Sequence, residues 1–175
     1  YGTDGAMYVG SLMGDVPFRN WRAGEWDDDA LQALDGATMA ETILTRAGTC
    51  HSCSVSCKRE VAVVDGSYIV AEGPGPEYES VAAFGSLVLV SDLAATAAAN
   101  DRCNRYGLDT ISCGATLAFA IEATEAGLLD SRLAWGDAAA ILEAVDDISH
   151  RRGLGDLLAE GSAAVAARLG PAASA

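Results

Sequence analysis

Three cysteines lie close together in the run Cys50-His51-Ser52-Cys53-Ser54-Val55-Ser56-Cys57, with the spacing C-x2-C-x3-C. Thiolates held on one short loop can converge on a soft metal centre, so this run constrains the chain more than any other feature. Three ligands from one loop leave a fourth position for a residue elsewhere, as in a [4Fe–4S] cluster. The order of the spacing disfavours the radical-SAM class, in which the three-residue gap comes first.

Zinc is the main alternative metal for such a run. Structural zinc sites usually show two separated C-x2-C pairs, or pairs of Cys and His, and here only one such pair is present. The spacing therefore favours iron–sulfur over zinc, and redox-active or incidental thiols are the remaining interpretation. His51 is expected at the surface or behind the ligands, because the flanking cysteines are better placed.

The composition of the chain limits its fold class, its partners and its cellular compartment. Its 175 residues are half hydrophobic, many of them Ala, and only 6% aromatic, which favours closely packed helices around one sizeable core. The longest apolar runs fall short of a membrane-spanning helix. A formal net charge of −14 argues against binding to nucleic acid or to an anionic membrane. Clustered thiols suit a reducing compartment and no signal peptide is recognisable, so we expect a cytoplasmic protein.

The patterns along the chain predict a mainly α fold with one small β-hairpin. Helices are expected over residues 27–34, 38–46, 91–106, 112–126, 137–152 and 155–169, the last interrupted at Gly161. The hairpin is expected to join Val61–Val64 to Ser67–Val70 through a tight Asp-Gly turn. Residues 1–25 are expected to be loop-like, with Trp21 and Trp26 as anchors.

Two motifs follow the cysteines in chain order, Gly75-Pro76-Glu77-Tyr78-Glu79 and Asn104-Arg105-Tyr106-Gly107-Leu108-Asp109-Thr110-Ile111-Ser112, and further matching stretches cover residues 16–21 and 153–161. Together they resemble the aldehyde ferredoxin oxidoreductase family of tungsten, and sometimes molybdenum, pterin enzymes. In that family an N-terminal β domain precedes two largely helical domains. The resemblance implies that residues 1–175 form a single helical domain, mainly the middle one. We expect a fragment of a larger enzyme, without the N-terminal β domain and the C-terminal domain.

The resemblance also implies roles for the clustered thiols. Cys50, Cys53 and Cys57 match three of the four [4Fe–4S] ligands of the family, and the fourth ligand belongs beyond the end of this chain. Neither Cys103 nor Cys113 stands where that ligand belongs. Cys113 is expected to be a small buried hydrophobe, with a position facing the pterin as the alternative.

The first pterin-binding motif of the family, D-x-x-G-L-D, matches Asn104, Gly107, Leu108 and Asp109. Asn104 replaces the first Asp, which keeps one acceptor and loses the charge. Asp109 can accept hydrogen bonds from the amino and ring N–H groups of a pterin. We expect Asn104 and Asp109 to face a common cleft, and Gly107 between them to have a positive φ, because a helix that stops before a new segment needs a left-handed residue. Without the resemblance, the stretch would be interpreted as the end of one helix and the start of the next.

The family places a proton-carrying glutamate in the Gly-Pro-Glu-Tyr-Glu stretch. We favour Glu79 over Glu77 for this role, although both would otherwise be interpreted as solvated loop charges. The implied reaction is oxidation of a small aldehyde to a carboxylate at a metal held by two pterins, with electrons passed through the cluster to ferredoxin or a similar carrier. The fragment alone is expected to be inactive, and the substrate and the oligomeric state stay open.

Two other functions remain. One is the catalytic subunit of a related tungsten-dependent aryl-CoA reductase, in which the same scaffold reduces a ring. The other is a non-enzymatic helical module whose three thiols hold zinc or stay empty. Metal and sulfide content would separate the enzyme from the module, because zinc sites contain no labile sulfide.

Overall fold

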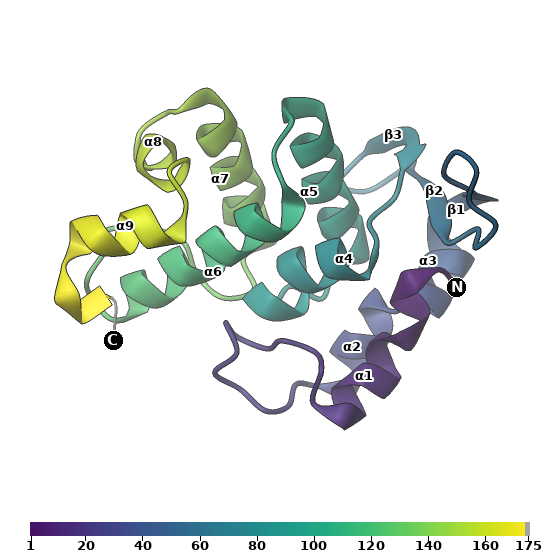
Figure 1. The fold of residues 1–175 in the computed structure, drawn as a ribbon, viewed down its shortest axis with the longest axis horizontal. Helices are drawn as coiled ribbons and strands as arrows, with labels where there is room; N and C mark the ends of the chain where they lie inside the picture. Colours follow the sequence, from purple (N-terminus) through teal and green to yellow (C-terminus); the bar gives the residue numbers. More distant parts are fainter. Residues whose placement is uncertain (174–175) are drawn as a thin grey trace.

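Helices α5 (Leu93–Tyr106) and α6 (Thr110–Glu125) form the centre of the computed structural model, which describes residues 1–173 (Figure 1). Helix α4 (Tyr78–Phe84) packs against both, and α7 (Ala138–His150) packs against α5. Alanines and aliphatic side chains dominate the buried residues of this group, so the helices can approach closely. The predicted helical class is confirmed.

Capping residues set the limits of these helices much as the sequence predicts. The Asp92 carboxylate accepts a hydrogen bond from the N–H of Ala95 at 3.0 Å and begins α5. Gly107, with a φ of 72°, ends the same helix. Asp137 caps α7 in the same way as Asp92 caps α5. These polar signals are local in sequence, which is why the pattern located them.

Shorter helices lie on either side of this group. The N-terminal ones are η1 (Thr3–Ala6), α1 (Met7–Met13), α2 (Asp28–Leu34) and α3 (Gly36–Thr42), and the later ones are η2 (Ser86–Val88), α8 (Leu154–Leu158), α9 (Ser162–Leu169) and η3 (Pro171–Ala173). Helix α1 lies where a loop was expected. Its Met7 is fully buried, so tertiary packing holds a helix that the glycine-rich sequence did not indicate. Within residues 1–173 no helix is long and apolar enough to cross a membrane.

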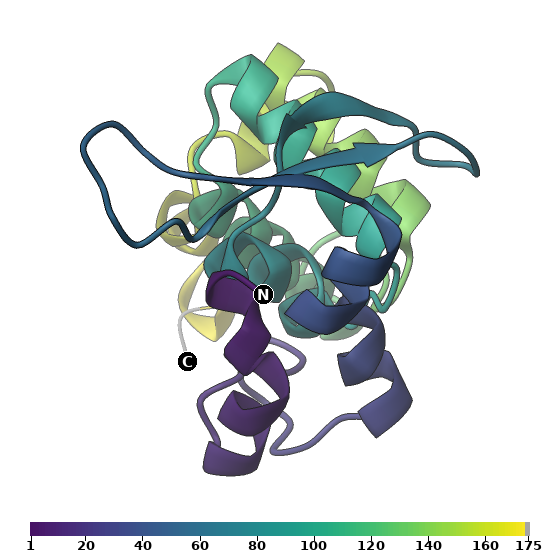
Figure 2. The ribbon, with the colours of Figure 1, turned by 90° about the vertical axis from the view of Figure 1, so that its right-hand side faces the viewer.

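A three-stranded antiparallel sheet in the order β1-β2-β3 lies next to α5 at one end of the molecule (Figures 1 and 2). The strands are β1 (Leu44–Gly48), β2 (Lys58–Val63) and β3 (Val70–Pro74). β2 and β3 form the predicted hairpin, but the connection between them is longer than the predicted two-residue turn at Asp65-Gly66. Val63 pairs with Val70, so residues 64–69 connect the strands. This register buries both valines in the core.

Strand β1 is a further difference from the sequence prediction. The expected helix over residues 38–46 ends at Thr42, and the chain from Leu44 pairs with β2. Leu, Arg and Ala favour helix locally, but here a non-local strand pairing decides the conformation.

The two expected tryptophan anchors have different outcomes. Trp26 packs near Phe18, with ring centroids 6.2 Å apart, and lies against the core. Trp21 is 67% exposed, so its prediction as an anchor is wrong. It ends a turn in which residues 19–21 all have positive φ. The presence of a tryptophan does not indicate such a backbone conformation, so the sequence did not predict the exposure of Trp21.

Candidate functional site

The three clustered cysteines share one loop, residues 49–57, which projects from the sheet between β1 and β2 (Figure 2). Cys50 is exposed, Cys53 and Cys57 are partly buried, and all three thiols are free. The predicted placement of the three thiols on a single loop is therefore confirmed. His51 is exposed beside them, as expected.

The predicted convergence of the three sulfurs is absent from this structure. Within residues 1–173 no three side chains of Cys, His, Asp or Glu are gathered so that they could hold a metal ion. The donor set nevertheless fits an iron–sulfur cluster, because three reachable thiols lie on one short loop. The Cys53 Sγ also accepts the N–H of Val55 at 3.5 Å, the type of amide contact that tunes cluster thiolates.

The Glu77 carboxylate is fixed by a residue from the far end of the sequence. The hydroxyl of Thr3 donates to Glu77 Oε2 at 2.5 Å and accepts the N–H of Tyr78 at 2.9 Å. Glu77 stands at the N-cap position of α4, where its own side chain makes no capping bond. Thr3 therefore supplies the cap, which is a structural task for this stretch.

Glu79 stands two residues further on, in the first turn of α4, and is exposed. Its charge contributes to raising the pKa of Tyr78, although burial of the Tyr78 ring is the larger cause. The two glutamates thus differ in situation: Glu77 is hydrogen-bonded to Thr3 and partly buried, and Glu79 is open to solvent.

Asp4 is a buried acid that sequence reasoning missed. Its side chain is 1% exposed, and neither carboxylate oxygen has a hydrogen-bond partner among residues 1–173. Burial is the main cause that raises the pKa of Asp4 to about 8, and the nearby charges of Asp35 and Glu77 add to it. No local signal marks this residue, because its burial arises from the packing of η1 against α3 and α4.

The pterin-like motif connects α5 to α6. Gly107 has the predicted positive φ, and Leu108 donates its N–H to the carbonyl of Cys103 at 2.9 Å. Asp109 caps α6 by accepting the N–H of Ser112 at 2.6 Å. This bond, followed by the Ser112 hydroxyl, lowers the pKa of the Asp109 carboxyl, which therefore stays ionised at neutral pH.

A hollow of about 110 Å³ brings this motif against a distant part of the chain. Its walls come from the start of α6, from α7 and from the α8–α9 connection, and the lining residues are Leu108, Asp109, Ser112, Cys113, Thr116, Ile148, Leu158, Ala159 and Gly161. Two of the stretches that carried the resemblance, residues 104–112 and 153–161, thus meet at one place. Asn104 does not line this hollow and lies exposed on the last turn of α5, so the structure does not show the cleft predicted for it to share with Asp109.

Cys103 and Cys113 are buried among the helices, away from the cysteine loop. A hydrogen bond to Cys103, together with burial, raises the pKa of the Cys113 thiol, which is therefore neutral. Its expected burial is confirmed. Cys113 also lines the hollow, and a position facing the pterin stays a prediction.

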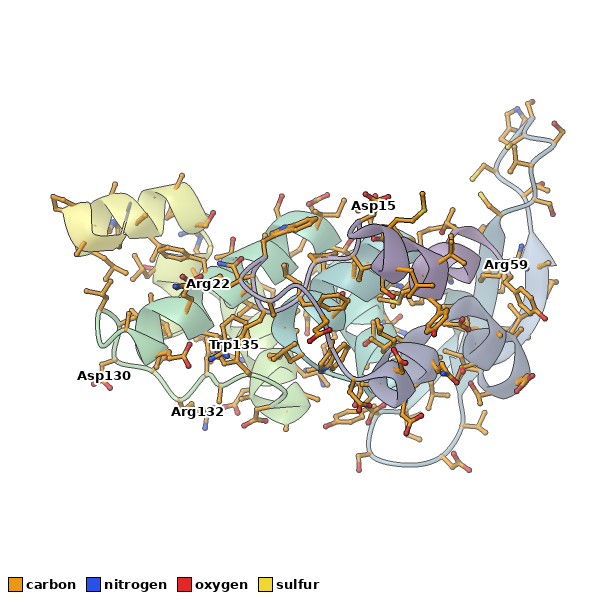
Figure 3. The ribbon with its side chains drawn as sticks, turned by 90° about the horizontal axis from the view of Figure 1, so that it is seen from below. Asp15, Arg22, Arg59, Asp130, Arg132 and Trp135 are labelled. Carbon is orange, nitrogen blue, oxygen red and sulfur yellow. The ribbon has the colours of Figure 1, made fainter. Side chains whose placement is uncertain are left out.

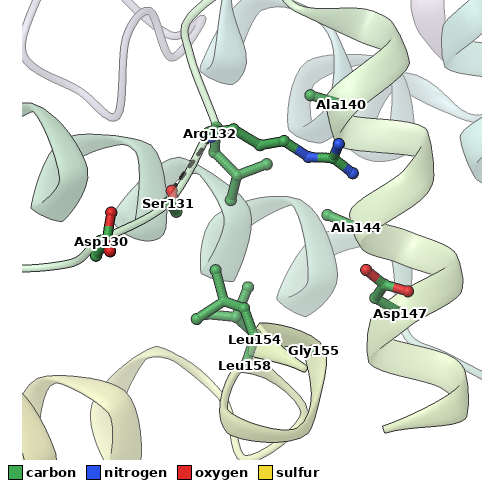
Figure 4. A pocket seen from close by; sticks show the side chains of 10 residues that line it. Asp130, Ser131, Arg132, Ala140, Ala144, Asp147, Leu154, Gly155 and Leu158 are labelled. Carbon is green, nitrogen blue, oxygen red and sulfur yellow. Dashed lines mark hydrogen bonds between the residues drawn. The ribbon is translucent and has the colours of Figure 1, made fainter. Parts of the chain in front are cut away.

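A second hollow, of about 210 Å³, lies between α7, α8 and the segment that follows α6 (Figure 4). Leu154 and Leu158 point into it from α8, and Ala140 and Ala144 face it from α7. Two of its charged groups are already paired: Arg132 binds Glu143, and Asp147 accepts from Arg152 at 3.0 Å. The hollow therefore offers a mainly aliphatic wall and little charge for a ligand.

Comparisons with known proteins agree with the family that the motifs resemble. The family model described as "Aldehyde ferredoxin oxidoreductase, domains 2 & 3" matches residues 1–175. A tungsten-containing aldehyde ferredoxin oxidoreductase from Pyrococcus furiosus is 37% identical over 169 residues, and the one from Thermococcus kodakarensis is 36% identical. Each alignment covers 93% of this chain and 27% of the relative. An aliphatic sulfonate oxidoreductase, WOR-like subunit, from Pyrococcus furiosus is 26% identical over 168 residues, which is 93% of this chain and 27% of the relative.

Among solved structures, the active site complex BamBC of benzoyl coenzyme A reductase matches 99% of this chain and 27% of its own, with a TM-score of 0.77. At 23% identity this match shows a shared fold. The family model that matches residues 1–175 and the identity to the tungsten enzymes show family membership as well as fold. This chain belongs to the aldehyde ferredoxin oxidoreductase family, and it spans about a quarter of the length of its curated relatives.

Proposed function

We propose that this chain is the helical central part of a tungsten or molybdenum pterin oxidoreductase that oxidises small aldehydes to carboxylates and passes the electrons to ferredoxin. The observation that carries the proposal is the exposed loop with three free thiols, in a chain of this family. The relatives with tungsten and aldehyde in their names are 34–37% identical to the chain, which favours this substrate class and this metal. As one part of a longer enzyme, the chain alone is expected to be inactive.

Cys50, Cys53 and Cys57 would hold three corners of a [4Fe–4S] cluster, with the fourth ligand supplied from outside this chain. Because the sulfurs are not gathered in the loop as it stands, binding requires the loop to close around the cluster. When bound, a metal–pterin centre of this family supplies two-electron oxidation, and a cluster supplies one-electron transfer. The task of this chain is to hold these groups and to manage protons.

Asp109, Leu108 and Gly107 would contribute to one pterin site at the hollow beside α6. The ionised Asp109 carboxylate accepts hydrogen bonds from N–H groups, and the hollow next to it has an apolar wall suited to a flat ring. Asn104 would extend this site from the last turn of α5. Its exposed amide offers one acceptor and two donors.

Glu79 would carry the proton of the reaction, since its carboxylate is open to an incoming group. Glu77 is engaged by Thr3 and would support the loop more than exchange protons. Closure of the site by the rest of the enzyme would move Glu79 into a drier setting, which favours a proton-carrying carboxyl.

The test is metal, sulfide and pterin analysis of the full-length protein made without oxygen. About four iron and four labile sulfide per chain, with tungsten or molybdenum and pterin, support the proposal. Loss of iron and sulfide in Cys53→Ser, together with retained tungsten, would assign the loop to the cluster. Stoichiometric zinc without sulfide would establish the non-enzymatic module in its place. Activity on aryl-CoA esters without activity on aldehydes would establish the aryl-CoA reductase branch.

A further inference from the structure

The cysteine loop has few internal contacts to hold its shape. The Cys53 N–H donates to the carbonyl of Cys50 at 3.1 Å, and the Ser56 hydroxyl donates to the carbonyl of Gly48 at 3.3 Å. Ser52 and Ser56 both have positive φ, a conformation that residues with side chains adopt rarely. A loop with such a backbone needs support from outside itself.

Arg59 supplies that support at the base of the loop (Figure 3). Its Nε donates to the carbonyl of Cys57 at 3.0 Å, and its Nη2 donates to the carbonyl of Ser56 at 2.5 Å. One planar guanidinium thus holds two successive carbonyls, which is a task for the rigid fork of arginine.

The N-terminal segment also contacts Arg59, through the backbone of Gly2. A Cβ placed on Gly2 would lie 3.0 Å from Arg59 Nε and 3.0 Å from the Cys57 carbonyl oxygen. Gly2 has a φ of 75°, which glycine adopts without strain. The backbone of Gly2 therefore lies directly against the hydrogen bond between Arg59 and Cys57.

Within the described part of the chain, the charge of Arg59 makes no ion pair, whereas most other basic side chains do. The chain has 25 acidic and 11 basic residues, and nine of the basic side chains make ion pairs within residues 1–173. Arg59 makes no ion pair in that part of the chain, and its guanidinium contacts the backbone of Cys57, whose thiol is of the type that ligates metals as a thiolate. A cation without a carboxylate partner next to such a loop can stabilise added negative charge there.

We propose that Arg59 is a positioning residue of the cluster loop: it fixes the backbone at Cys57 and places an unpaired positive charge at the base of the loop, which raises the reduction potential of the bound cluster. This rests on the proposed function, in which Cys57 is a cluster ligand. Reduction adds one electron to the cluster, and a nearby fixed cation stabilises the reduced form more than the oxidised form.

The test compares three variants of the full-length protein made without oxygen. Arg59→Met removes the fork and the charge, and Arg59→Lys keeps the charge but not the fork. Arg46→Met is the matched control, because Arg46 is a cation of the same sheet whose ion pair is to Glu60, away from the loop carbonyls. The readouts are iron and sulfide retention during exposure to a chelator, and the cluster potential from a redox titration followed by electron paramagnetic resonance.

In Arg59→Met we expect iron retention to fall by about tenfold or more, the usual effect of removing a group that supports metal ligands. We also expect the potential to fall. Arg59→Lys should keep a potential close to that of the unmodified protein while losing iron faster, and Arg46→Met should match the unmodified protein in both. Should Arg59→Met fail to fold, Arg59→Lys alone tests the proposal, which predicts faster loss of iron with an unchanged reduction potential.

An unchanged potential in Arg59→Met, or an equal fall in Arg46→Met, would overturn the proposal while leaving the cluster itself in place. If the unmodified protein contains no iron and sulfide under these conditions, the proposed function fails, and the role of Arg59 fails with it. The two failures are therefore distinguishable.

Discussion

At the scale of single residues, the buried Asp4 carboxyl has the clearest consequence. Its pKa is about 8 in the folded chain, against an ordinary value of 3.8. Between these pH values the folded chain keeps a proton that the unfolded chain releases, so the free energy of unfolding falls as the pH rises from about 4 to about 8. Below and above this window the residue contributes no pH dependence.

Asp4→Asn should remove this dependence, because the amide does not ionise. At pH 7 the variant should be more stable by about 2–4 kcal/mol, the free energy of holding the carboxyl protonated some three pH units above its usual pKa. Urea unfolding of the chain at pH 5, 7 and 8.5 would measure the effect. Asp65→Asn, at an exposed loop position, is the control and should change little. Equal pH dependence in Asp4→Asn and the unmodified chain would contradict the assignment.

Glu79 and Glu77 offer a second comparison between neighbouring residues. In the full-length enzyme Glu79→Gln should keep the metal and pterin but reduce aldehyde oxidation by about 10²-fold or more, the usual effect of losing a general acid–base group. Glu77→Gln should reduce it less, since the amide oxygen introduced by this change can still accept the Thr3 hydroxyl. The measurement is kcat with metal content determined in parallel. Full turnover in both variants would make this stretch a structural turn alone.

At the scale of helices and strands, Asp109 caps α6, and substitution can separate this task from its proposed role in binding a pterin. Asp109→Ala should lose the hydrogen bond to the Ser112 N–H, at a cost of about 1 kcal/mol, and should also lower the pterin content. Asp109→Ser keeps a capping hydroxyl without the charge, so it should recover stability but not pterin. Asp137→Ala is the control, because it removes the same kind of cap from α7, away from the hollow.

Thermal unfolding and pterin content of the full-length protein would measure both properties. Normal pterin content in Asp109→Ala would leave Asp109 as a helix cap only. A matching loss of pterin in Asp137→Ala would mean that helix stability, and not the Asp109 carboxylate, accounts for the effect.

The contact between α4 and α6 gives a prediction about packing. A Cβ on Gly114 would lie 2.6 Å from the Ala83 carbonyl oxygen and 2.7 Å from the Ala83 Cβ. Gly114→Ala should therefore force the helices apart and destabilise the chain by about 1–3 kcal/mol. Gly24→Ala is the control, because a Cβ at Gly24 meets no neighbouring atom. Urea unfolding that places both variants at equal stability would show that the contact relaxes without cost.

The same scale shows how far the sequence could predict the fold. Asp92, Gly107 and Asp137 act within a few residues of themselves, so the helices they limit were predictable. Strand β1 was not, because its pairing joins it to β2 across the whole cysteine loop. Helix α1 was missed because its sequence is rich in glycine, although Gly14 caps its end and Met7 is fully buried in the folded chain.

At the scale of the whole molecule, some features of the candidate site were predictable from the sequence and others depend on the tertiary fold. The motifs predicted that the cysteines share a loop and that Gly107 takes a positive φ, and both are local properties. The meeting of residues 104–112 with residues 153–161, the cap that Thr3 provides and the burial of Asp4 depend on the tertiary fold. No pattern along a single sequence records such contacts.

Residues Gly2 and Thr3 contact two of the candidate functional segments. Gly2 lies against Arg59 and Cys57, and Thr3, the next residue, holds Glu77 and the start of α4. Replacing Gly2 and Thr3 together in the full-length protein would therefore loosen the cysteine loop and the glutamate stretch at once. Under the proposed function, cluster retention and proton transfer would then fall together after a change that touches neither a cluster ligand nor a glutamate.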